Sequence, residues 1–376
     1  MDSITQATLG AVVGHLSWHK QLGPKALLAG AVIGTVPDLD IILYPLLDGV
    51  QRLYWHRGES HSVFFLVFGV VATTWLLQRY FFKGKITFAT TCWGVFLIYS
   101  THILIDTFTI YGTQLLAPLS RKGYGIGNFF IIDPLFTLLL LAGVAYICLG
   151  KPSRHTRVNS IMLILAACYT AWSLAIQSTA DAKFRNATDK AGYEVTRHIT
   201  TAGPFTTFLW RHLAEIPDGY ILGYWSIFDG SDKNIVFHFI PKSAEKTKTL
   251  NGGRSFAVIE WFSQGWWCAI PSSEETVRII DLRFTEIPSS HHQGHQYWNW
   301  PFSWNFTLAL GKDQPLQPLA PELHGLLPTL KLLAHRIAGG YGWLSDNVKM
   351  EAPVLGGPIE MHLPSAGKRG NEERGR

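Results

Sequence analysis

The sequence predicts an α-helical polytopic membrane domain followed by a mainly β soluble domain. Long apolar runs fill residues 60–180, and acidic and histidine side chains recur within and between them. From residue 181 onward, apolar and polar positions alternate in several segments, which is typical of strands. A chain of 376 residues is too long for one ordinary core. We therefore expect a transmembrane metal-site domain over 1–180, a β domain over 181–362 and a disordered tail over 363–376.

Composition excludes some classes of function. The net charge of +5 is modest and comes partly from loops and the tail, so no nucleic-acid partner is expected. Three of the four cysteines lie in apolar runs, and only Cys268 lies in the second half. The sequence therefore predicts neither a disulfide framework nor a cysteine-rich zinc site.

The N-terminal segments are expected to pack closely and to break once. Residues 3–18 predict a short helix in which small residues, including Gly10 and Gly14, allow another helix to approach. Residues 26–46 form a second apolar segment that contains Pro37, where we expect the helix to break. Broken backbone at membrane depth is tolerated only where protein or a watery cavity surrounds it.

Four further apolar runs are each roughly 20 residues long, the length that crosses the hydrocarbon core. With the N-terminal segments they give about five membrane segments, and these four runs span residues 62–82, 86–105, 129–149 and 158–177.

Basic residues between the runs predict the orientation. Two basic loops lie two spans apart, so both are placed in the cytoplasm, although Arg121 and Lys122 oppose this assignment. The C-terminal domain is then expected on the outer side. The basic residues of the two loops are Arg79, Lys83, Lys85, Lys151, Arg154 and Arg157.

Residues 35–62 contain the ligand types that a divalent metal prefers. Asp38 and Asp40 follow Pro37, and His56 and His61 come shortly afterwards. Irregular backbone after the proline would place both carboxylates on one side. The alternatives are that Asp38 caps a helix and that the two histidines lie at the headgroup interface.

Other metal-ligand candidates lie on the predicted helices. His102 and Asp106 are four residues apart and share a helix face, so both could bind one metal, or Asp106 could orient His102. The alternative is a polar pair that joins two helices. Asp133 is either a further ligand or a charge at a helix start. His15 is a candidate ligand, whereas Gln6 could contribute only a hydrogen bond.

Two charged residues between His56 and His61 are candidates for catalysis. Arg57 could hold a phosphate or carboxylate of a substrate, because its guanidinium suits bidentate contacts, or it could anchor the chain at the interface. Glu59 could be a general base or simply a solvated side chain.

The C-terminal half is predicted to form a largely antiparallel β domain. Aromatic and β-branched residues alternate with polar ones, and turn signals such as Asp229-Gly230 separate the segments. The expected strands cover residues 220–228, 234–240, 255–262, 276–284 and 304–310.

The motifs together resemble a known family. The stretches VPDLD, HRGESHS, HILID and YGTQLLAPLS, followed by FIIDPLFT, resemble the YdjM-like family of bacterial membrane-bound metal-dependent hydrolases over roughly residues 1–180. Many members have histidine where this chain has Gln6. The resemblance implies a multi-pass protein of the bacterial inner membrane, and it points to Asp38, Asp40, His56, His61, His102, Asp106 and Asp133.

These observations lead to one functional hypothesis and two alternatives. The hypothesis is a hydrolase with one or two divalent metals, zinc or manganese, that acts on a lipid or lipid-linked ester or phosphoester through metal-activated water. Arg57 would steady the anionic part of the substrate, and Glu59 or a free carboxylate would move a proton. The alternatives are a metal or proton transporter and a non-catalytic membrane anchor with a structural metal.

Overall fold

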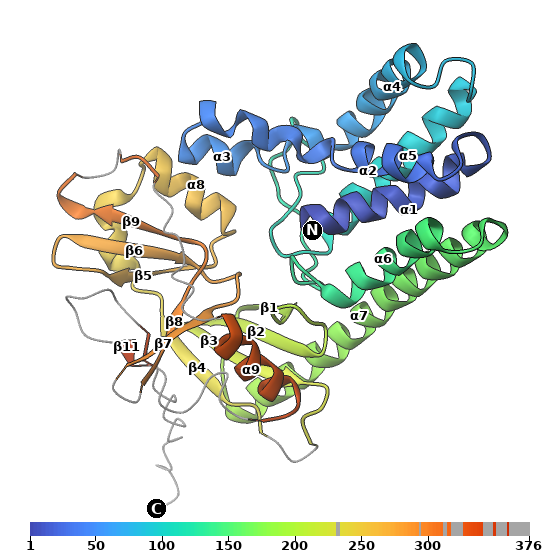
Figure 1. Cartoon of the computed structure of the whole chain (residues 1–376). Helices are drawn as coiled ribbons and strands as arrows, with labels where there is room; N and C mark the ends of the chain where they lie inside the picture. Colours follow the sequence, from blue (N-terminus) through green and yellow to red (C-terminus); the bar gives the residue numbers. More distant parts are fainter. Residues whose placement is uncertain are drawn as a thin grey trace, which may run out of the picture.

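A computed structural model describes residues 1–230, 234–292, 295–310, 314–316, 326–340, 349–350 and 359–360. The predicted tail, 363–376, lies outside these residues. The fold class is confirmed: a helical N-terminal region is followed by a region that contains two larger antiparallel sheets (Figure 1).

Seven α-helices build the N-terminal region, with short 3₁₀ segments between some of them. Their bounds are α1 Ser3–Leu22, α2 Lys25–Gly34, α3 Gly49–Trp55, α4 Val63–Tyr80, α5 Phe88–Thr107, α6 Pro134–Leu149 and α7 His155–Ala191. The 3₁₀ segments are η1 Pro37–Leu46, η2 Glu59–His61 and η3 Pro152–Arg154.

Within the described residues, three helices are long and apolar enough to cross a membrane, namely α4, α5 and α7. A fourth span is possible if α2 and η1 count as one broken segment, since the two are bent by 49° at the break expected near Pro37. The sequence predicts about five segments. The remaining one corresponds to α6, which is apolar but only 16 residues long.

Glycines let α1 and α2 pack at backbone contact. A Cβ atom added to Gly30 would lie 2.2 Å from the carbonyl oxygen of Gly10, and one added to Gly14 would lie 2.5 Å from the Cα atom of Gly30. This close approach was predicted from the small residues of α1. It brings the end of α2, and therefore η1, against the core of the helical region.

The helix α7 connects the two regions. It has 37 residues, extends well beyond the predicted span at 158–177, and ends against the first sheet (Figure 1). Phe184 of α7 is fully buried in a cluster with Trp210 and Ile221 of that sheet. The sheet is therefore packed directly on a continuation of a membrane helix.

Antiparallel sheets dominate the C-terminal region. The first has the order β1-β2-β3-β4 and the second the order β5-β6-β9, and β7 pairs with β8. One face of the first sheet packs on α7, and the opposite face packs against the second sheet. The strands are β1 Arg197–Ala202, β2 Leu209–Ile216, β3 Gly219–Ser226, β4 Phe237–Pro241, β5 Trp267–Pro271, β6 Thr276–Asp281, β7 Ile287–His292, β8 His295–Asn299 and β9 Ser303–Thr307.

Helices and short pairings complete the described part of this region. These are η4 Ala244–Leu250, α8 Arg254–Phe262, η5 Leu308–Leu310, α9 Leu326–Ile337, β10 Lys349–Met350 and β11 Ile359–Glu360.

One predicted strand is wrong. Residues 255–262 form the helix α8, in which Phe256, Ile259 and Phe262 are buried at spacings of three residues. A short apolar run is compatible with either a strand or a helix face, and here packing against the second sheet selects the helix.

Candidate metal centre

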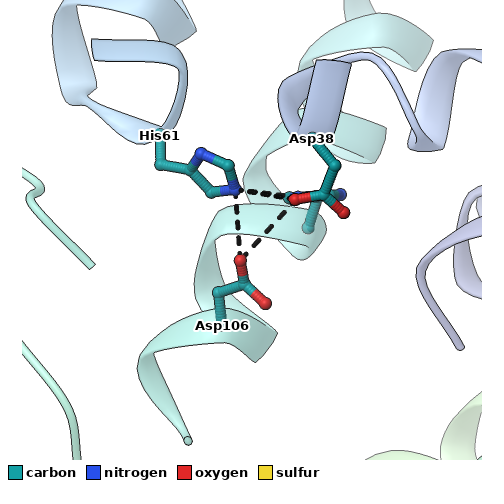
Figure 2. A group of neighbouring side chains, drawn as sticks. Asp38, His61 and Asp106 are labelled. Atoms are coloured by element: carbon teal, nitrogen blue, oxygen red, sulfur yellow. Dashed lines mark hydrogen bonds and ion pairs between the residues drawn. The ribbon is translucent and has the colours of Figure 1, made fainter. Parts of the chain in front are cut away.

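Four side chains from three separate segments converge on one point. Asp38 comes from η1, His61 from η2, and His102 and Asp106 from one face of α5. One ligand atom of each lies within 4.8 Å of the others, and Figure 2 shows the carboxylates of Asp38 and Asp106 directed at the ring of His61. Among the described residues this is the group of acids, histidines and cysteines that can hold a metal ion.

The distances between these atoms suit a small divalent ion. The Nε2 atom of His61 lies 3.3 Å from Asp38 Oδ1, 3.2 Å from Asp106 Oδ2 and 3.2 Å from His102 Nε2. His102 Nε2 lies 3.5 Å from Asp38 Oδ1 and 3.9 Å from Asp106 Oδ2. Ligand bonds of about 2.1 Å place the atoms around a tetrahedral ion about 3.4 Å apart. The four atoms therefore surround a space of the right size.

Hydrogen bonds outside the group fix the two imidazole rings. The Nδ1 atom of His102 lies 2.7 Å from the carbonyl oxygen of Gly34, to which it donates, so its Nε2 lone pair faces the group. The Nδ1 atom of His61 lies 3.0 Å from the hydroxyl of Ser60. Both rings thus present Nε2 to the same point, as in metal sites whose ligands are held by a second layer of contacts.

Asp106 has one satisfied oxygen and one that faces the group. Its Oδ1 atom accepts from Gln6 Nε2 at 2.8 Å and contacts the amino group of Met1. Its Oδ2 atom is buried and accepts no hydrogen bond within the described residues, but it forms an ion pair with Arg57 Nε. A bound cation would add a ligand bond to this oxygen beside its ion pair with Arg57.

Arg57 holds Asp106 from the side. Its Nε atom lies 3.3 Å from Asp106 Oδ2, its Nη1 donates to Thr109 Oγ1 at 2.9 Å, and its guanidinium lies 4.9 Å from the ring centre of Tyr111. The backbone of Arg57 adopts a left-handed φ of 52°, which is uncommon for a side chain of this size. When both histidines are neutral, the two carboxylates of the group face two cationic groups, the guanidinium of Arg57 and the amino group of Met1.

Asp40 and His56 form a separate pair. The Nδ1 atom of His56 lies 3.2 Å from Asp40 Oδ2, and that oxygen also accepts from the backbone N–H of Arg57 at 3.0 Å. The sequence predicts that Asp38 and Asp40 lie on one side, on the assumption that the backbone after Pro37 is irregular. The structure forms a 3₁₀ helix there, with about three residues per turn, so residues two apart diverge.

Three other predicted residues lie outside the group. Glu59 forms an ion pair with Arg121, whose guanidinium lies 4.3 Å from the ring centre of Tyr54. Asp133 caps α6 by accepting from the N–H of Phe136 at 2.9 Å. The ring of His15 stacks on that of His19, in the second half of α1.

The predicted contribution of Gln6 as a hydrogen-bonding residue matches its contact with Asp106. Thr109 and Tyr111 did not emerge from the sequence. The sequence signal for them is their position one turn beyond Asp106, at the helix end. Burial raises the pKa of Tyr111, so its hydroxyl stays protonated at neutral pH.

The apolar helices and the convergent acids and histidines define a membrane protein with a group of side chains that can bind a metal. More particularly, residues 1–180 match the model of the family described as YdjM inner membrane protein.

Two bacterial proteins are similar to parts of the chain. The chain is 27% identical over 176 residues to "Uncharacterized protein YfhP" of Bacillus subtilis (strain 168), a match that covers 45% of this chain and 53% of the relative. It is 29% identical over 111 residues to "Inner membrane protein YbcI" of Escherichia coli (strain K12), which covers 29% of this chain and 61% of that protein. The chain thus spans between half and two thirds of these relatives. No solved structure matches.

Proposed function

We propose that the protein is a membrane-embedded, metal-dependent hydrolase that acts on a lipid or lipid-linked ester or phosphoester. The observation that carries this proposal is the convergence of two imidazole nitrogens and two carboxylate oxygens, with five of their separations between 3.2 and 3.9 Å. Mixed nitrogen and oxygen ligands suit zinc or manganese. A bound divalent ion would supply a Lewis acid that polarises the scissile group and activates water.

The ligands differ in exposure, which gives the site an accessible side. The side chains of His61, His102 and Asp106 are at most 1% exposed, whereas that of Asp38 is 19% exposed. A substrate would therefore approach past Asp38. Manganese, with a larger coordination number than zinc, would keep positions open beside four protein ligands.

The Asp40–His56 pair is suited to proton transfer. Asp40 binds His56 at Nδ1, so the Nε2 atom of His56 is the one that would take up or release a proton. His56, Tyr111 and Gln114 line a small cavity of about 20 Å³, which has room for one water molecule. This pair, rather than Glu59 with its ion pair to Arg121, is the better candidate for the acid–base role.

Arg57 is better suited to positioning than to substrate binding. Its guanidinium is buried and already contacts Asp106, Thr109 and Tyr111. Its backbone N–H binds Asp40 as well, so one residue connects the four-ligand group with the proton-transfer pair.

The proposed orientation would let a lipid substrate reach the site from the outer side of the inner membrane. The turns that follow α1, α4 and α6 carry basic residues and lie at the end of the helical region far from the sheets (Figure 1). On the positive-inside rule we propose that this end lies in the cytoplasm, so that the metal group and the C-terminal region would lie on the outer side. A lipid could reach the group by lateral diffusion.

The test measures metal and hydrolysis on the same samples. The full chain, His61→Ala and a matched control, His198→Ala, are purified in detergent without chelator. The ring of His198, in β1, pairs with Asp181 of α7. Metal is counted by elemental mass spectrometry. Hydrolysis is measured with p-nitrophenyl esters, bis(p-nitrophenyl) phosphate and phospholipid vesicles. We expect near-stoichiometric metal and activity in wild type and His198→Ala, and neither in His61→Ala.

Other outcomes would contradict the proposal in distinct ways. Metal that is retained in His61→Ala would refute the site. Metal with no hydrolysis, but with ion flux into vesicles, would indicate a transporter. Metal with neither hydrolysis nor flux, and unfolding on its removal, would indicate a structural ion in a membrane anchor.

A further inference from the structure

The first sheet lies against the second half of α7, and one of its ends carries several aromatic side chains (Figure 1). The strands β1 to β4 are antiparallel and follow chain order, so the β1–β2 turn and the segment after β3 lie at the same end. A backbone hydrogen bond of 2.9 Å, from the N–H of Ile227 to the carbonyl oxygen of Phe208, joins these two segments. We call this end, residues 203–208 and 227–228, the aromatic edge.

Side-chain contacts fix the aromatic edge to α7 and to the start of α6. Thr207 is fully buried, and its Oγ1 atom lies 2.7 Å from the hydroxyl of Tyr169 in α7. That hydroxyl donates to Oδ2 of Asp133, the residue that caps α6, at 3.0 Å. Phe205 has a left-handed φ of 58°, and its ring centre lies 5.2 Å from that of Phe130. The position of the edge beside the two helices is therefore fixed.

A row of aromatic rings connects α7 with the exposed side of this edge. Tyr169 stacks on Trp172 with ring centres 5.7 Å apart, and both belong to a candidate membrane span. The ring centre of Phe208 lies 5.5 Å from that of Trp172, and the ring centre of Phe228 lies 5.9 Å from that of Phe208. Trp172 and Phe208 are half-buried, whereas Phe228 is 57% exposed. The row therefore begins in a membrane helix and ends at an exposed ring.

The exposure of Phe228 is unusual for the C-terminal region. Among the described residues after 180, four large apolar side chains are exposed, and Phe228 is the aromatic one. The next residue, Asp229, is buried and forms an ion pair with Arg336, so its carboxylate does not oppose contact of the ring with an apolar phase. Aromatic side chains that are partly exposed gather where a protein meets the membrane–water interface.

We propose that the aromatic edge contacts the bilayer surface at which α7 leaves the membrane, with the ring of Phe228 among the lipid headgroups. The partner is the bilayer because the row of rings continues from Trp172, which lies near the end of the span predicted over 158–177. Aromatic rings concentrate at this depth, since the ring packs on acyl chains and its edge meets water. The contact holds the first sheet on the membrane in addition to α7.

The test measures lipid contact at single positions of the full chain. The cysteines that are exposed or half-buried are replaced by alanine, and these are Cys92, Cys148 and Cys168. The buried Cys268 is retained. One cysteine is then introduced by Phe228→Cys or by the matched control Asp218→Cys, which changes an exposed residue in the β2–β3 turn. The 8 residues of β3 separate these two ends of the sheet by about 25 Å, at about 3.3 Å per residue.

Each cysteine is labelled with nitrobenzoxadiazole, a fluorophore that reports the polarity around it. The protein is reconstituted into vesicles of phosphatidylethanolamine and phosphatidylglycerol that contain a nitroxide-labelled phospholipid. We expect the fluorophore in Phe228→Cys to emit at a shorter wavelength than in water and to be quenched by the nitroxide. In Asp218→Cys it should emit as in water and escape quenching.

A second measurement retains an aromatic ring at the tested position. With p-benzoylphenylalanine in place of Phe228, illumination should produce an adduct with phospholipid that mass spectrometry detects, whereas the same replacement of Asp218 should give none. Circular dichroism and a thermal midpoint establish that each variant is folded.

Three outcomes would each overturn the proposal. They are absence of quenching in folded Phe228→Cys, equal quenching in Asp218→Cys, and photo-adducts with a second copy of the chain in place of lipid. None of these measurements depends on bound metal or on hydrolysis, so the failure of this proposal can be told apart from the failure of the proposed function.

Discussion

The contact between α1 and α2 predicts that one methyl group on Gly30 will weaken metal binding from a distance. In Gly30→Ala, the new Cβ atom would lie 2.2 Å from the carbonyl oxygen of Gly10. An ordinary contact needs about 3.5 Å, so the helices must separate by about 1 Å. Both neighbouring groups are backbone, and no side-chain rotation can relieve the overlap.

The separation acts on the metal group through the end of α2. The carbonyl oxygen of Gly34 accepts from Nδ1 of His102 at 2.7 Å, and a displacement of about 1 Å breaks that hydrogen bond. Loss of a contact that orients a metal ligand lowers metal affinity about 10- to 100-fold. Gly34 also lies close in sequence to Asp38, whose position would shift with it.

The assay is a competition between the protein and a chromophoric chelator for zinc and for manganese, in detergent. Gly230→Ala is the matched control, because a Cβ atom at Gly230 meets nothing within 4 Å. We expect wild-type affinity in Gly230→Ala and a 10- to 100-fold loss in Gly30→Ala. A folded Gly30→Ala protein with unchanged affinity would refute the link between helix packing and the site.

Three further predictions follow from the same structure. Chelation should lower the thermal midpoint of wild type but not of His61→Ala, since an ion at 100 times its Kd adds about 2.7 kcal/mol to stability. Asp40→Asn should retain metal but lose about 10²- to 10⁴-fold in kcat, and an equal rate would exclude the proton-transfer pair. Burial lowers the pKa of His212 to about 3, so the folded state keeps it neutral while the unfolded state takes up a proton below about 6.5. Stability should therefore fall as pH drops from about 6.5 toward 3, by at most about 1.4 kcal/mol per pH unit from this group. Denaturant titrations at pH 7 and pH 5 should show that the free energy of unfolding falls less with pH in His212→Gln than in wild type.

Much of the architecture could be predicted because it depends on local patterns. The apolar runs, the break near Pro37 and the shared face of His102 and Asp106 follow from residue spacing alone. Alternation predicted strands in the second half, but residues 255–262 have a pattern that fits both structures, and tertiary packing decided for a helix.

The composition of the candidate site was less accessible to sequence reasoning. Asp38 and Asp40 separate because the local backbone is 3₁₀, which one proline does not determine. Glu59 is bound by Arg121, a contact across 62 residues of chain that no local pattern encodes. The hydrogen bond from His102 to the carbonyl oxygen of Gly34 and the ion pair between Arg57 and Asp106 likewise depend on long-range packing.

The length of α7 has a consequence for how the two regions communicate. At about 1.5 Å per residue, its 37 residues measure about 55 Å, nearly twice the hydrocarbon thickness, without an interruption. The first sheet is therefore attached to one continuous helix. The direction in which the sheet faces depends on the point of the helical turn at which α7 reaches it. One residue inserted into α7 beyond the membrane span would rotate the sheet by about 100° around the helix axis, whereas seven inserted residues would nearly restore its orientation. The relative orientation of the two regions thus depends on the number of residues in α7.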